Sequence, residues 1–145
     1  MTVPTQQSLK QAFFALIKTD SAGSAVRAAL GAGATSVLSQ RQFEAAVSSG
    51  LPTAPFMVLR FGPVTGQAFD MRTIFPTWWL YDDAVQGHYR LNALAVLIEA
   101  VYAAEDNHPI VGCHVAYAGG IGDEVTDERL ARPALSMRYQ VRNRF

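Results

Sequence analysis

A run of chemically capable side chains lies between residues 78 and 90, where the sequence reads WWLYDDAVQGHYR. Asp82 and Asp83 could share general acid–base work, and His88 could join them. The adjacent Trp78 and Trp79 could stack on a sugar ring or lie in a protein interface. Four kinds of site therefore compete here: an active site, a sugar-binding platform, a metal site and a seam between subunits.

A metal site needs three or four converging ligands, commonly seeded by a closely spaced pair such as C-x2-C. The imidazole and thiol groups of the chain are His88, His108, Cys113 and His114. Cys113 and His114 are adjacent in an expected strand, so their side chains point to opposite faces. His88 and His108 lie near opposite ends of an expected helix, about 30 Å apart. The spacing therefore predicts no metal site, and the single cysteine permits no intrachain disulfide.

Motifs for nucleophilic catalysis and nucleotide binding are missing from the sequence. The chain has no G-x-S-x-G elbow, and its LGAGAT segment has neither the lysine nor the preceding strand of a phosphate loop. Cys113 lies in an apolar run, where a thiol is usually an inert core group. Asp82–Asp83 fit the N-terminal cap of a helix, and Asp123–Glu124 fit a solvated turn. We therefore expect no catalytic residue and no cofactor.

The two tryptophans are adjacent in an expected strand, so their rings should point to opposite faces of a sheet. One ring can then enter the core while the other faces solvent or a partner. Aromatic side chains are enriched at protein interfaces, although partial burial of both rings fits the sequence as well.

The totals describe one globular domain spanning residues 1–145. Half the residues are hydrophobic and 17% are charged, which indicates a folded chain and leaves room for apolar surface that a partner covers. The formal net charge is zero, so bulk charge predicts no nucleic-acid binding. The N-terminus has no apolar signal core, and no apolar run reaches about 18 residues, so we expect a soluble protein.

Hydrophobic periodicity predicts the elements. Helices are expected over 8–18, 21–34 and 84–104, the second being a short helix or a small-residue linker. Strands are expected over 35–43, 56–62, 67–81, 110–120 and 134–145, with an acidic-then-basic loop over 122–133. The second and third strands should form a hairpin, with Pro76 at a bulge or an edge. Strands and helices are segregated, which predicts an α+β fold: a mostly antiparallel sheet with two main helices packed on one face.

The last strand shows the clearest alternation in the chain. Its apolar face carries Leu135, Met137, Tyr139, Val141 and Phe145. Its polar face carries Ser136, Arg138, Gln140, Arg142 and Arg144. This alternation predicts a strand with one buried face and one cationic face. The helix over 84–104 likewise has one stripe that should be buried, formed by Leu91, Leu94, Ala95, Ile98, Val101 and Tyr102.

Two longer patterns carry a resemblance. In the first pattern, a strand ends in an aromatic residue and a Tyr-Asp pair, and a glycine-containing turn leads into a helix that begins Tyr-x-Arg-Leu-Asn. The residues of this pattern are Trp79, Tyr81, Asp82, Gly87, Tyr89, Arg90, Leu91 and Asn92. The second is AYAGGIGDEVTDERLARPALSMRYQV, with Asp127, Glu128, Arg138 and Tyr139 at the matching places. Together with LPTAPFMVLRFG, these segments resemble the siphophage tail terminators and related tail-completion proteins of tailed phages. The chain departs from that pattern at GGIG and over residues 21–36, which leaves the subfamily open.

The resemblance implies a structural protein and not an enzyme. Such proteins form a ring, typically a homo-oligomer of six copies, that caps the tail tube and faces the head-side connector or stopper protein. Genomic DNA would pass through the ring without specific binding. The resemblance places the protein in the tail or neck of the virion, after assembly in the host cytoplasm. Another neck component, such as a head-side stopper or adaptor, stays open as an alternative. A small ligand-binding domain or enzyme that uses the cluster from Trp78 to His88 is a further alternative that stays open.

A closed ring buries one patch of each copy against a different patch of its neighbour. The arginines of the last strand could meet the acidic segment 123–128 of the next copy, or they could face solvent or, least favoured, DNA. The candidate interface residues are Trp78, Trp79, Tyr81, Asp83, Arg90, Asp123, Glu124, Asp127, Glu128, Arg138, Arg142 and Arg144.

Overall fold

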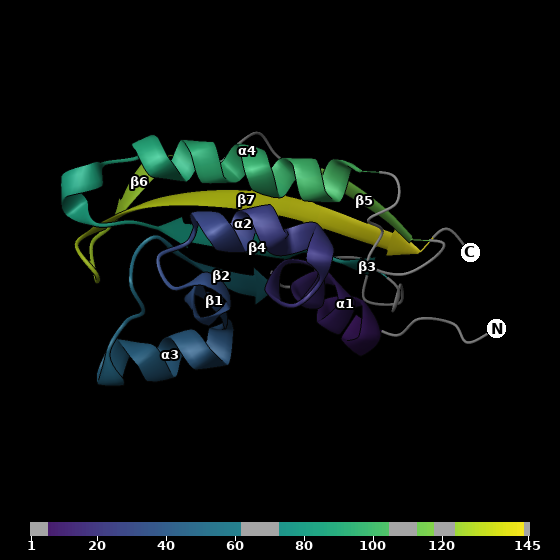
Figure 1. The fold of residues 1–145 in the computed structure, drawn as a ribbon. Helices are drawn as coiled ribbons and strands as arrows, with labels where there is room; N and C mark the ends of the chain where they lie inside the picture. Colours follow the sequence, from purple (N-terminus) through teal and green to yellow (C-terminus); the bar gives the residue numbers. More distant parts are fainter. Residues whose placement is uncertain (1–5, 62–72, 105–112, 118–123, 144–145) are drawn as a thin grey trace.

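The computed structural model describes residues 6–61, 73–104, 113–117 and 124–143. These residues form one sheet with helices packed on both of its faces (Figure 1). The strands at its centre are β2 (Phe56–Phe61), β4 (Pro76–Tyr81) and β7 (Arg132–Asn143), and each pairs antiparallel with the next. The α+β class and the mostly antiparallel sheet are therefore confirmed, as is the antiparallel pairing expected of the first hairpin.

Four short strands complete the sheet. β1 (Val37–Ser39) pairs parallel with β2, while β3 (Thr73–Ile74), β5 (Cys113–Tyr117) and β6 (Glu124–Asp127) all pair antiparallel with β7. The prediction of a loop over 122–133 is wrong, because residues 124–127 form β6. β7 begins earlier than the sequence pattern indicated, and a tight turn after Asp127 folds the acidic segment back onto β7. Leu130 N donates to Asp127 Oδ1 at 3.1 Å inside that turn.

β3 and β4 form one interrupted strand along β7. Ile74 of β3 pairs with Val141 of β7, and Thr77 of β4 pairs with Arg138 of β7. Both strands advance by three residues between these pairs, so the register is unchanged across Pro76. An unchanged register means that no bulge residue is inserted. Pro76 opens β4 and faces Phe61, the last residue of β2, where the missing N–H costs the ladder little. The part of the expected strand over 67–72 lies outside the described residues.

One face of the sheet is covered by α1 (Gln6–Lys18), α2 (Ser24–Ala29) and α4 (Tyr89–Ala103). The side chains predicted to be buried are buried; they are Leu9, Phe13, Leu16 and Ile17 of α1 and Leu91, Leu94, Ala95, Ile98, Val101 and Tyr102 of α4. Trp78 lies beneath them, and its Nε1 donates to the Tyr102 hydroxyl at 3.0 Å. Tyr102 in turn donates to the Phe13 carbonyl at 3.0 Å and stacks on the Phe13 ring at 4.3 Å. The buried polar atoms of both aromatics are thereby satisfied.

α2 is a helix and not a linker. Its Val26 is buried, and Arg27 Nη1 donates to the carbonyls of Ile17 and Asp20, each at 2.7 Å. Gly31 follows the helix because a Cβ there would lie 2.3 Å from the Thr53 carbonyl oxygen. This close approach holds α2 against the loop that leads into β2.

A further helix, α3 (Gln40–Ser49), covers the opposite face of the sheet. The strand expected over 35–43 is therefore wrong beyond Ser39. A capping box starts the helix: Ser39 Oγ accepts from Gln42 N, and Gln42 Oε1 accepts from Ser39 N. Phe43 anchors it, with ring contacts to Phe56 at 6.4 Å and to Tyr81 at 5.6 Å. The two main helices predicted for one face are α1 and α4, and α3 makes the sheet two-sided.

Candidate functional site

The corner, defined here as residues 82–90 between β4 and α4, does not hold the helix cap that the sequence suggested. The chain passes through a short helical turn, Ala84–Gln86, and through Gly87 at a φ of 58° before α4 begins. His88 occupies the N-cap position of α4, and its side chain makes no capping hydrogen bond. The intervening turn separates Asp82 and Asp83 from the first turn of α4, and this is the physical reason why the predicted cap is wrong.

Asp82 is fully buried and serves instead as an anchor for Arg90. Arg90 Nε donates to Asp82 Oδ2 at 2.8 Å, and Arg90 Nη2 donates to Oδ1. The hydrogen bond to Asp82 raises the pKa of the Arg90 guanidinium above its ordinary value. Asp82 Oδ1 also accepts from the Asp83 amide at 2.7 Å. A buried carboxylate that holds both an arginine and a backbone amide in this way acts as a structural bracket.

The remaining polar groups of the corner bind neighbouring elements. Asp83 Oδ1 pairs with Arg132 Nη1 of β7 at 3.1 Å. His88 Nε2 lies 2.9 Å from the Val125 carbonyl oxygen, so this nitrogen carries the hydrogen. Asn92 Nδ2 donates to Glu124 Oε1 at 2.8 Å. His88 Nδ1 also lies 3.9 Å from Glu124 Oε2. Asp83, His88 and Glu124 therefore attach β6 and β7 to the start of α4, with Asp83 paired to Arg132 and His88 close to Glu124.

Metal ligands do not cluster in the part of the chain that the structure describes, where no three His, Cys, Asp or Glu side chains come together. His108, which the sequence offered as one possible metal ligand, lies outside the described residues. Cys113 and His114 are placed by backbone only, in β5 opposite Asn143 and Arg142.

The two tryptophans point to opposite faces of the sheet, as predicted. Trp78 is fully buried under α1 and α4, so no partner can reach it. Trp79 packs partly buried on the α3 side, where the Arg60 guanidinium lies 5.4 Å from its ring centre and 5.4 Å from that of Phe43. Arg60 Nη2 also donates to the Tyr81 hydroxyl at 3.2 Å. Burial raises the pKa of Tyr81 to about 12.

The charged residues proposed for the interface are only partly described. Arg138 is exposed on β7 opposite Thr77, and Glu124 and Glu128 are exposed on β6 and in the following turn. Asp127 is half-buried, and its carboxylate contributes to the raised pKa of Tyr81. The side chain of Arg142 and the whole of Asp123 and Arg144 lie outside the described residues. Contact between this acidic segment and the arginines of another copy therefore stays a prediction.

An apolar surface that sequence reasoning missed runs over the corner and along α4. Val85, Tyr89 and Val96 are 89%, 84% and 59% exposed. Ala93 and Ala100 are exposed on the same side of the helix. The signal in the sequence is that YRLNALAVLIEAVYA has only three polar residues, Arg90, Asn92 and Glu99, so apolar residues extend beyond the stripe that faces the sheet. We call the exposed set Val85, Tyr89, Ala93, Val96 and Ala100 the α4 ridge.

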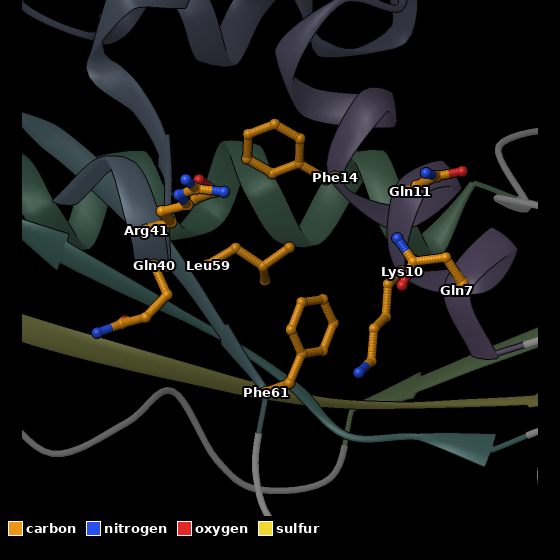
Figure 2. Close-up of a pocket in the computed structure, with 9 residues that line it drawn as sticks. Gln7, Lys10, Gln11, Phe14, Gln40, Arg41, Leu59 and Phe61 are labelled. Carbon is orange, nitrogen blue, oxygen red and sulfur yellow. The ribbon is translucent and has the colours of Figure 1, made fainter. Parts of the chain in front are cut away.

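A groove of about 330 Å³ lies between α1, the start of α3 and the end of β2. Figure 2 shows Phe14, Leu59 and Phe61 around its centre, and these three residues form the apolar floor. The rim consists of Gln7, Lys10, Gln11, Gln40 and Arg41. Lys10 Nζ lies 4.9 Å from the centre of the Phe61 ring. We call this feature the α1–α3 groove; it combines an apolar floor with an amide and cationic rim.

Comparison with known proteins adds no relative: no family model, curated protein or solved structure matches this chain. In the described part of the chain, none of the helices combines the length and the apolar character needed to cross a membrane.

Proposed function

We propose that this protein is a structural subunit that assembles with copies of itself into a ring of the siphophage tail-terminator kind. The ring would cap the tail tube and meet the head-side connector or stopper protein. The resemblance of residues 79–92 and 116–141 to tail-terminator and tail-completion proteins suggests this class. Six copies and a DNA passage without specific binding follow from the same resemblance.

The observation that carries self-assembly is the exposed apolar side of α4. A surface helix normally has one apolar stripe that faces the core and polar residues on the opposite side. α4 packs one side on the sheet and leaves Tyr89 and Val96 exposed on the other. Exposing this much apolar surface is costly in a free monomer, and contact with another protein removes it from water.

The tightly bonded corner also favours an assembly role over a catalytic one. Asp82 and His88 are the best candidates for acid–base chemistry in the sequence. Asp82 accepts hydrogen bonds from Arg90, and His88 donates one to the Val125 carbonyl. Such contacts fix the shape of the corner and leave an apolar outer surface. Fixed shape is what a subunit of a closed ring requires.

Native mass spectrometry of the purified chain, alone and with its tail tube protein, tests the proposal. We expect one discrete oligomer, with six copies as the expected number, and an arrest of tube growth visible by electron microscopy. A chain that stays monomeric at all concentrations and leaves tube growth unaffected would contradict the proposal. Another neck component would also assemble, so labelling the protein in intact virions distinguishes the tube end from the head-side position.

A further inference from the structure

Two apolar surfaces of the chain lie at opposite ends of the β2–β4 pair. Tyr81, the last residue of β4, pairs with Phe56 and leads into the corner that carries Val85 and Tyr89. Phe61, at the other end of the same ladder, belongs to the floor of the α1–α3 groove. Figure 1 likewise shows α1 and the start of α4 at opposite ends of the sheet. One copy cannot bring its own two surfaces together, whereas two neighbouring copies can.

We infer that copies of this chain associate head to tail, with the Tyr89 corner of one copy seated in the α1–α3 groove of the next. The occupant of the groove is thus a second copy of the same chain. The inference rests on the proposed function and names the surfaces that build its ring. Contacts between two different patches of identical subunits generate a closed ring, or a filament where the rotation fails to close.

The chemistry of Tyr89 fits the groove. A tyrosine carries an apolar ring and a polar tip, so it binds best where an apolar floor meets polar rim groups. Phe14, Leu59 and Phe61 supply that floor, and Gln7 and Gln11 place amides beside it. The volume of about 330 Å³ is large enough to hold one large side chain. Tyr89 is also the kind of residue that dominates binding energy at interfaces.

The charges of the two surfaces are complementary. Lys10 and Arg41 lie on the groove rim, and among the described residues that line the groove there is no carboxylate. Asp83 lies in the corner and Glu124 contacts Asn92 in the first turn of α4, and their side chains remain 53% and 54% exposed despite their contacts within the chain. Opposed patches of this kind favour the head-to-tail orientation over the contact of two corners or two grooves, which would bring like charges together.

The interface has room to grow beyond this anchor. α4 has 15 residues, so its exposed ridge extends about 22 Å from Tyr89 at roughly 1.5 Å per residue. Val96 and the exposed alanines continue the apolar surface along that length. A stable interface buries roughly 800 Å² per partner, so the ridge would supply one part of that area and the corner and groove the rest.

Two variants, each with one surface destroyed, test the head-to-tail contact. Tyr89→Asp puts a charge at the centre of the corner, and Gln11→Trp fills the groove from an exposed position on α1. Each variant alone should be monomeric in native mass spectrometry, with apparent association weakened by at least about tenfold. Mixed at equal concentration, the variants should form a one-to-one dimer, because the Tyr89→Asp copy keeps its groove and the Gln11→Trp copy keeps its corner.

The conservative Tyr89→Phe variant keeps the ring and loses the hydroxyl, so it should assemble more weakly than the wild type and far better than Tyr89→Asp. Circular dichroism melting checks that every variant is folded. A mixture that stays monomeric overturns the head-to-tail pairing, as does a Tyr89→Asp chain that assembles normally. Rings that persist in both variants but no longer bind the tube protein would assign the two surfaces to that protein and overturn the inference while leaving the proposed function in place. A monomeric wild type would overturn both.

Discussion

At the scale of single residues, Asp82 shows why a sequence motif for catalysis can be part of a structural bracket. Its position before a helix, beside another acid and near a histidine, fits both a cap and an acid–base pair. The structure places Asp82 out of solvent, where it accepts hydrogen bonds from Arg90, eight residues later, and from the Asp83 amide. Asp82 N also donates to the Pro133 carbonyl at 3.2 Å, which ties the corner to β7.

Replacing Asp82 with alanine should therefore destabilise the fold far more than replacing Asp83. The Asp82→Ala change removes a buried acceptor and leaves donors unpaired, and we expect a loss of about 2 kcal/mol or more in the free energy of unfolding. Asp83→Ala breaks a half-exposed pair with Arg132 and should cost less than about 1 kcal/mol. Urea denaturation of the two variants measures both values. Equal losses would contradict the bracket.

Tyr81 gives the protein a dependence on alkaline pH. Burial raises the pKa of Tyr81 from its ordinary 10.0 to about 12 in the folded state. The stability that this residue contributes is fully present below the unfolded pKa and is lost as the pH rises through the folded value. We expect the free energy of unfolding to fall between about pH 10 and 12.

A Tyr81→Phe variant isolates this effect, because phenylalanine keeps the ring and cannot ionise. At pH 8 the variant should be less stable than the wild type by roughly 1 kcal/mol, since it loses the hydrogen bond with Arg60. The difference in the free energy of unfolding between the wild type and Tyr81→Phe should narrow as the pH approaches 12. Tyr102, whose pKa burial also raises, contributes equally to both chains and cancels from the comparison. Denaturation curves that stay parallel over this range would count against the assignment.

At the scale of elements, burial patterns were predictable where one element supplies a long apolar stripe. α1 and α4 have such stripes, and β7 alternates cleanly over Leu135, Met137, Tyr139 and Val141. α3 has no stripe, because Phe43 is its one fully buried residue and polar groups surround it. Helix propensity and apolar periodicity therefore did not predict α3, although the capping-box residues Ser39 and Gln42 can be recognised in the sequence.

The candidate site was predictable only in part, for a related reason. The split between Trp78 and Trp79 follows from strand geometry alone. The pairing of Asp82 with Arg90 requires the turn at Gly87, and the docking of Glu124 on Asn92 requires β6 to fold back against α4. Such contacts depend on how elements meet in space. The groove between α1, α3 and β2 was out of reach because α3 itself was missed.

The capping box makes a testable claim about α3. Ser39→Ala removes the acceptor for Gln42 N and should lower the free energy of unfolding by about 1 kcal/mol. Ser49→Ala, at the other end of the same helix, removes an exposed hydrogen bond to Ala45 and should change stability by less than about 0.5 kcal/mol. Urea denaturation compares the two. A Ser39→Ala chain as stable as Ser49→Ala would show that Phe43 packing alone holds the helix.

At the scale of the whole molecule, the two faces of the sheet differ in what they leave exposed. The α3 side buries Phe43, Phe56 and Tyr81 and leaves only modest apolar exposure, with Val47 37% exposed. The α4 side buries the larger core and still leaves Tyr89 and Val96 largely uncovered. This asymmetry supports the proposal that a partner covers α4, while α3 would face solvent or a more polar neighbour.

A pair of valine substitutions tests that asymmetry. Val96→Glu and Val47→Glu each place one carboxylate on an exposed helix position, so both monomers should stay within about 0.5 kcal/mol of the wild type in stability. Only Val96→Glu should weaken assembly, because burying an unpaired charge in an interface costs several kcal/mol or prevents the contact. Light scattering across a concentration series reads out both variants. If Val47→Glu is the one that disrupts the oligomer, the interface lies on the α3 face and the ridge of α4 is a solvent-exposed surface.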